Sequence, residues 1–119
     1  FFPEEDKVFM SDGYVAKDFL GYGFLQAAFT ARYTTGGGLT LFILHGKDKD
    51  ASVMLNSYLG MMKEDKIRHE DGIYVINDFF NGYVFLTLKN NYIAGAYDVR
   101  DEKAALTLIK KITERITEK

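Results

Sequence analysis

Cysteine and tryptophan are absent from this sequence of 119 residues, and proline occurs once. Without cysteine the chain has no disulfides, no thiolate metal ligands and no cysteine nucleophile. No apolar run approaches the roughly 20 residues that a membrane-spanning helix needs. The opening residues 1–6 lack the basic and apolar stretches of a signal peptide. Because the chain begins with Phe and not Met, we expect it to be a fragment, so that an upstream signal or domain has been left out.

An excess of charge of one sign is also missing. The 15 basic and 17 acidic residues give a net charge of -2, and the two signs alternate along the chain. A nucleic-acid partner would require a basic surface to neutralise phosphates. We therefore expect no nucleic-acid partner and, from the lack of long apolar runs, no membrane span.

Apolar residues, in contrast, are plentiful. They make up 47% of the chain, and ten Phe and eight Tyr account for its 15% of aromatic residues. A chain of this length and composition can bury its own hydrophobic core. The sequence predicts one folded domain over residues 1–119.

Residues 73–99 predict a meander of three antiparallel strands. Asn81-Gly82 and Asn90-Asn91 are typical of two-residue hairpin turns, because their residues tolerate positive φ. Such turns would place Phe80 opposite Tyr83 and Lys89 opposite Tyr92.

This register would divide the meander into two faces, since alternate side chains point to opposite sides. The predicted core face carries Ile73, Val75, Phe79, Val84, Leu86, Leu88, Ile93 and Tyr97. The predicted outer face carries Tyr74, Ile76, Asp78, Phe80, Tyr83, Phe85, Thr87, Tyr92, Ala94 and Ala96. The outer face is more aromatic than a solvated sheet face should be.

Another hairpin and two helices are predicted outside the meander. Gly36-Gly37-Gly38 separates two apolar strands and would pair Thr35 with Leu39. Apolar residues recur with helical spacing over residues 49–64, where Asp48 or Asp50 would be the N-cap. They do so again over residues 101–117, where Asp98 or Asp101 would be the N-cap.

The order of these elements predicts an α+β fold. We expect a two-layer sandwich in which a largely antiparallel sheet of about five to six strands carries both amphipathic helices on one face. Residues 28–119 supply the hairpin, helix, meander and helix. Residues 1–27 form a wrapping segment that could hold an edge strand, a loop or a short helix over residues 18–26.

Residues 17–25, 29–33 and 41–43 resemble the later half of a bacterial family known as a domain of unknown function. Phe2-Pro3 and the apolar pattern of residues 51–59 fit the same family. The resemblance implies a longer exported protein, periplasmic or secreted, with a related segment before this one. It brings no established activity and no catalytic residues.

Signatures of catalysis and of metal binding are weak. His45 and His69 are the only histidines, and they lack ligand-type spacing. No serine lies in a Gly-x-Ser-x-Gly turn, and Gly36-Gly37-Gly38 lacks the Lys-Ser/Thr of a phosphate loop. We expect no enzymatic activity, no metal and no cofactor.

The aromatic outer face is the candidate binding surface, because exposed aromatic patches usually mark interaction sites. The predicted binding residues are Arg32, Phe42, Tyr74, Asp78, Phe80, Tyr83, Phe85 and Tyr92. Alternatively, the aromatic residues of the wrapping segment fold over this face and close a second core. These residues are Phe9, Tyr14, Phe19, Tyr22 and Phe24.

The sequence therefore favours a non-enzymatic binding domain of an exported bacterial protein. Its partner would be another domain of the same protein, a separate protein or a small ligand, and the chain would be a monomer or a weak homodimer. The alternative is a part of an enzyme whose active site needs the upstream segment, with Arg32, Asp78 and His45 as polar contributors.

Overall fold

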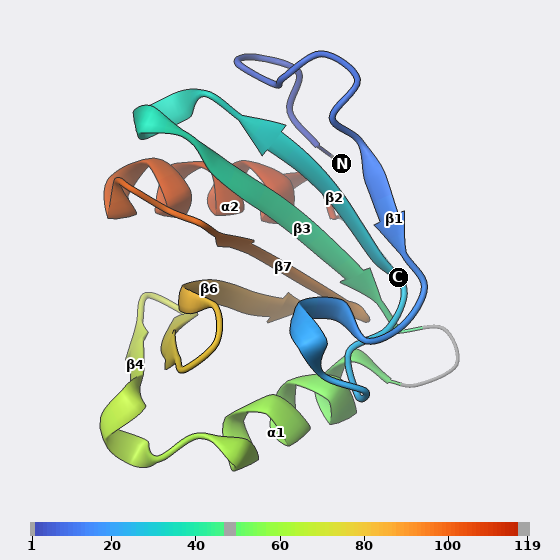
Figure 1. Ribbon diagram of the computed structural model, residues 1–119, viewed down its shortest axis with the longest axis vertical. Helices are drawn as coiled ribbons and strands as arrows, with labels where there is room; N and C mark the ends of the chain where they lie inside the picture. The colour runs from blue at the N-terminus through green and yellow to red at the C-terminus, as the bar shows by residue number, and fades with distance from the viewer. Residues whose placement is uncertain (1, 47–49, 117–119) are drawn as a thin grey trace.

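The computed structural model describes residues 2–46 and 50–116, which form one antiparallel sheet with two α-helices (Figure 1). The strands are β1 (Gly13–Val15), β2 (Ala28–Tyr33), β3 (Leu39–His45), β4 (Ile67–Glu70), β5 (Ile73–Asp78), β6 (Gly82–Lys89) and β7 (Tyr92–Tyr97). The helices are α1 (Ala51–Met61) and α2 (Glu102–Arg115), with short 3-10 turns η1 (Phe19–Gly21), η2 (Thr35–Gly37) and η3 (Glu64–Lys66). The strand order is β1-β2-β3-β7-β6-β5-β4. The predicted α+β class is confirmed, and β1 and β4 at the two edges bring the strands to seven.

The helices differ from the prediction in their placement, because they lie on opposite faces of the sheet. Leu108, Ile109 and Ile112 of α2 pack in one core, with alternate residues of β3 that include Leu41. Met54 and Tyr58 of α1 pack in a second core on the other side. The cause is the central strand β3, whose residues 39–44 are all buried and therefore need a cover on both faces.

Both helices are slightly shorter than predicted. The side chain of Asp101 accepts a hydrogen bond from Lys103 N and caps α2, as predicted. Asp50 occupies the N-cap position of α1, whereas Asp48, the other candidate cap, lies outside the described residues. Within residues 2–46 and 50–116, neither helix has the length and apolar character needed to cross a membrane.

Two of the three predicted hairpin registers differ from the structure. Lys89 lies opposite Tyr92, as predicted. In the β2–β3 hairpin, Leu39 pairs with Tyr33 and not with Thr35 as predicted. Because this shift is two residues, the side chains of both strands stay on their predicted faces. The prediction that Phe80 lies opposite Tyr83 is wrong.

In the β5–β6 hairpin, Tyr83 lies opposite Asn77, and Asp78 lies opposite Gly82. A three-residue loop therefore joins these strands. It is held by the Asp78 carboxylate, which accepts hydrogen bonds from Phe80 N and Asn81 N. Tyr83 thus pairs with Asn77, three residues earlier than the predicted partner Phe80. A shift by an odd number of residues moves the side chains of β5 to the opposite face relative to those of β6 and β7. Val75 and Phe85 consequently share the α2 side, and Phe85 is a core residue.

The wrapping segment supplies part of the second core. Phe19, Tyr22 and Leu25 are buried on the α1 side of the sheet, so aromatic residues of this segment do cover one face. Phe9 and Tyr14, in contrast, are exposed. β1 is the edge strand that pairs with β2.

The tight packing at Gly95 of β7 gives a first prediction. A Cβ at this position would clash with Phe85 O and with the ring of Phe42. We expect Gly95→Ala to lower the free energy of unfolding by roughly 1–3 kcal/mol, because the sheet and the ring must both move. Urea denaturation of the purified chain measures this change.

Gly60 is the matched control, because it lies in α1 and a Cβ there would meet nothing within 4 Å. Gly60→Ala should raise the free energy of unfolding by about 0.5–1 kcal/mol, since alanine is the better helix former. Equal stability of both variants would contradict the packing described at Gly95.

Candidate functional site

A buried carboxylate organises one end of the β5–β6 hairpin. Asp78 is 2% exposed. Tyr22 OH donates to its two oxygens over 3.1 and 3.0 Å, and Tyr58 OH donates over 2.5 Å. Phe80 N and Asn81 N donate to Oδ1 over 2.8 and 3.1 Å. Two side chains and two backbone groups thus satisfy a charge that would otherwise be costly to bury.

The hydrogen bonds decide the charge state of this cluster. Burial opposes ionisation of Asp78, but donation from Tyr58, Phe80, Asn81 and Tyr22 outweighs it and lowers the pKa of the carboxyl. Burial, together with donation to Asp78, raises the pKa of Tyr22 to about 12 and also raises that of Tyr58. At neutral pH the cluster is therefore one carboxylate with two neutral phenols.

The loop that the Asp78 carboxylate holds exposes two phenylalanines to solvent. Phe79 and Phe80, which we call the aromatic tip, are 89% and 76% exposed. Their rings lie edge to face, 5.2 Å apart. On the other side of the loop, Asn81 Nδ2 donates to Leu20 O over 3.1 Å. The loop is thus tied to the body of the domain while its two rings remain in water.

A shallow hollow of about 270 Å³ lies next to the aromatic tip, and we call it the polar hollow. It is lined by Asn81, Gly82, Tyr83, Asp98, Val99 and Arg100. Tyr83 is 57% exposed, and Asp98 and Arg100 bring charges of both signs. The loop that carries the two apolar rings therefore continues directly into a hollow with groups that can form directional polar contacts.

The predicted binding residues do not form one patch. Phe42, Asp78 and Phe85 are buried, Tyr74 and Tyr92 are half-buried, and Arg32, Phe80 and Tyr83 are exposed. They are distributed over both faces of the sheet: Phe42 and Tyr74 pack on the α1 side, and Phe85 and Tyr92 pack on the α2 side. Of the exposed three, Phe80 lies in the loop and Tyr83 follows it at the start of β6.

Each histidine stacks on a tyrosine of a neighbouring strand. The rings of His45 and Tyr92 are 4.3 Å apart, and those of His69 and Tyr74 are 4.0 Å apart. In the described part of the chain, no three side chains of the His, Cys, Asp and Glu types come together as a metal-binding group.

Sequence reasoning missed three residues of this region. Phe79 was assigned to the core face, and Asp98 and Arg100 were not considered as binding residues. The available signal was Asp78 itself, which precedes Asn81-Gly82 by three residues. Asp side chains readily hydrogen-bond backbone N–H groups two residues later, and this favours the longer loop.

Comparisons with known proteins give no assignment. A scan against family models, a search of curated proteins and a search of solved structures found no match to this chain.

The Asp78 cluster gives the second prediction. Asp78→Asn keeps the size of the side chain but replaces an oxygen that accepts hydrogen bonds with an NH₂ group. We expect a loss of about 3 kcal/mol or more in unfolding free energy at pH 7, because buried donors lose a charged acceptor.

The pH dependence follows from the lowered pKa. The carboxylate stabilises the fold fully above the pKa of the unfolded chain, near 4, and this contribution is lost as the pH falls through the lower folded pKa. Urea denaturation between pH 7 and pH 3 should therefore show the gap between wild type and Asp78→Asn narrowing below about pH 4. Asp65→Asn, at an exposed carboxylate, is the control. A gap that widens on acidification would contradict the assigned charge state.

Proposed function

We propose that this chain is a non-enzymatic interaction domain of an exported bacterial protein, and that the aromatic tip with the polar hollow binds a protein. The partner is another domain of the same protein or a separate chain. The observation that carries the proposal is the exposure of Phe79 and Phe80 on a loop fixed by a buried carboxylate. Export rests on the resemblance of residues 17–25, 29–33 and 41–43 to an exported family.

The physical case begins with the cost of exposure. Burial of a phenylalanine side chain usually stabilises a protein by about 1.5–3 kcal/mol, and two adjacent rings that remain in water do not gain this free energy. Sheet residues such as Phe42 and Phe85 do gain it. Burial of the tip against a partner would recover this free energy. Because Asp78 already fixes the backbone of the loop, little conformational entropy would be lost on binding.

The groups beside the tip favour a protein as the partner. Interfaces between proteins combine buried aromatic anchors with polar contacts at the rim, and arginine and tyrosine are enriched there. Tyr83, Asp98 and Arg100 provide the polar part of this combination, in the hollow that begins directly after Phe79 and Phe80 in the chain. The net charge of -2 gives no bulk attraction for nucleic acid.

The enzyme alternative receives no specific support from the arrangement of its candidate residues. Asp78 is buried and hydrogen-bonded within the fold. Arg32 and His45 occupy strand positions of opposite parity on β2 and β3, so their side chains lie on opposite faces of the sheet. The three groups therefore do not converge.

The third prediction tests the tip. We expect the double variant Phe79→Ser, Phe80→Ser to fold with wild-type stability, because both side chains are exposed. Its affinity for a partner isolated with the wild-type protein should fall roughly thirtyfold or more, as expected for the loss of an interface anchor worth about 2 kcal/mol. Calorimetric titration of the purified pair measures this change, and light scattering reports whether the partner is a second copy.

Phe9→Ser, Met10→Ser is the matched control, because these residues form another exposed apolar pair, 88% and 81% exposed. It should bind the partner like the wild type. A tip variant that retains full affinity for every partner recovered would refute the proposal.

A further inference from the structure

A second hollow of about 330 Å³ lies on the α2 side of the sheet, where β1, β2, β3 and the start of β7 meet the N-terminal segment. We call it the N-terminal hollow. It is lined by Phe2, Asp12, Gly13, Phe29, Thr30, Ile43, His45 and Tyr92. Its volume falls at the lower end of the range for small-molecule sites, which suits one ring system with a short substituent.

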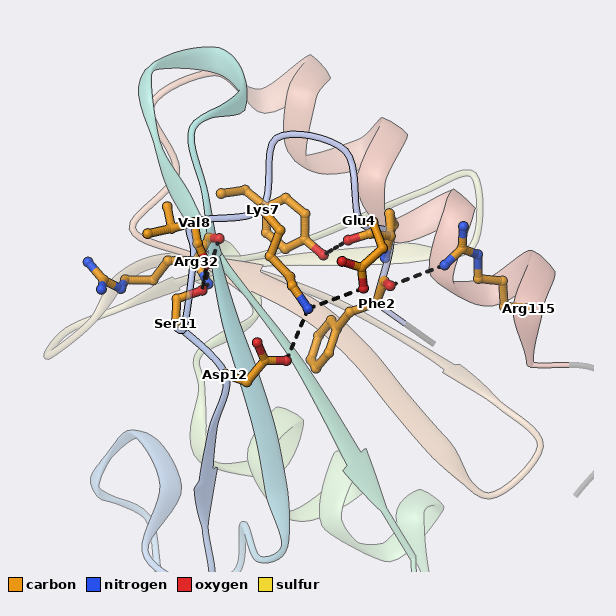
Figure 2. Close-up of polar contacts among 10 residues, drawn as sticks. Phe2, Glu4, Lys7, Val8, Ser11, Asp12, Arg32 and Arg115 are labelled. Carbon is orange, nitrogen blue, oxygen red and sulfur yellow. Dashed lines mark hydrogen bonds and ion pairs between the residues drawn. The ribbon is translucent and has the colours of Figure 1, made fainter.

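Hydrogen bonds hold the N-terminal wall of this hollow in place (Figure 2). Arg115 Nη1 donates to Phe2 O over 3.1 Å, and Tyr33 OH donates to Pro3 O over 2.5 Å. Farther along the segment, Val8 N donates to Arg32 O over 2.8 Å. The first residues are therefore fastened both to α2 and to β2, and the wall is a built part of the domain.

The sides of the hollow are largely aromatic. Phe2 lies at the N-terminal wall, Phe29 on β2 is 48% exposed, and the rings of His45 and Tyr92 are stacked 4.3 Å apart. Ile43 of β3, which pairs with Phe29, adds an apolar side chain to the lining. Ring faces carry negative electrostatic potential, so such walls accept an aromatic ring and also attract a cation.

Among the residues that line the hollow, the charge also favours a cation, whereas Arg115 and Lys7 lie outside the lining. Asp12 is the one carboxylate among the lining residues, in the part of the chain that the structure describes, and no Lys or Arg lines the hollow. Figure 2 shows Lys7 between Asp12 and Glu4, with Nζ 3.2 and 3.4 Å from their carboxylates. One ammonium thus serves two carboxylates, and the side chain of Asp12 remains 58% exposed.

We propose that the N-terminal hollow binds a small aromatic amine. The ring lies between Phe2, Phe29 and Tyr92, and the ammonium group points to Asp12. The carboxylate and the ring faces both favour the positive charge, so an amine binds more tightly than a carboxylic acid with the same ring. This site shares no residue with the aromatic tip or the polar hollow, so the two proposals can fail separately.

The fourth prediction uses two indole probes of opposite charge, tryptamine and indole-3-propionate. Because the chain has no tryptophan, fluorescence anisotropy of the indole reports binding directly. We expect tryptamine to bind with a dissociation constant on the order of 1 mM. Indole-3-propionate should bind several-fold more weakly.

Three variants locate the probe. Asp12→Asn should weaken tryptamine about fivefold, the effect of one partly exposed ion pair, and should leave indole-3-propionate equal or tighter because Lys7 loses a carboxylate. Phe29→Ala should weaken both probes, since both use the ring wall. Phe80→Ala, at the aromatic tip, should leave both unchanged.

Three outcomes overturn the proposal. They are no saturable binding of tryptamine, equal binding of the two probes by the wild type, and binding that neither Asp12→Asn nor Phe29→Ala changes. The last outcome would place the probe elsewhere on the surface.

Discussion

A single buried carboxylate connects three parts of this chain that are distant in sequence. Asp78 accepts from Tyr22 of the wrapping segment, from Tyr58 of α1 and from the backbone of its own loop. A buried charge is tolerated only when its hydrogen bonds are complete, so each of these donors supports the position of the others. The apolar cover of the α1 face is therefore tied together by one polar side chain that lies at the end of β5.

The same carboxylate connects the fold to the candidate site. Its bonds to Phe80 N and Asn81 N produce the three-residue loop, and this loop turns Phe79 and Phe80 into solvent. A two-residue turn at Asn81-Gly82 would place Phe79 in a strand. The exposed tip is thus a consequence of how the second core is closed, and a change at Asp78 would alter stability and surface together.

The sequence was sufficient to predict most helices and strands, but it was insufficient to predict the register in which the strands pair. Helical spacing and strand alternation are local, and they predicted α1, α2 and most strands close to their observed bounds. The β5–β6 register depends on donors such as Tyr22 and Tyr58, and local turn preference at Asn81-Gly82 pointed to a shorter loop. The candidate site carries the same error: Phe80 and Tyr83 are exposed, as expected, whereas Phe85 was expected on the surface and is buried.

The two helices lie on opposite faces of the sheet, and the face of α2 also carries the N-terminal hollow. Residues 39–44 of β3 form an unbroken buried run, and the prediction of both helices on one face failed because such a strand needs a cover on both sides. Seven strands about 4.8 Å apart span about 29 Å. On its face, α2 packs mainly against β7, β6 and β3, on one side of the β1–β2 margin. Phe29 of β2 lies at this margin, where its side chain remains exposed and the N-terminal hollow opens, so the second proposed site lies beside the part of the face that α2 covers.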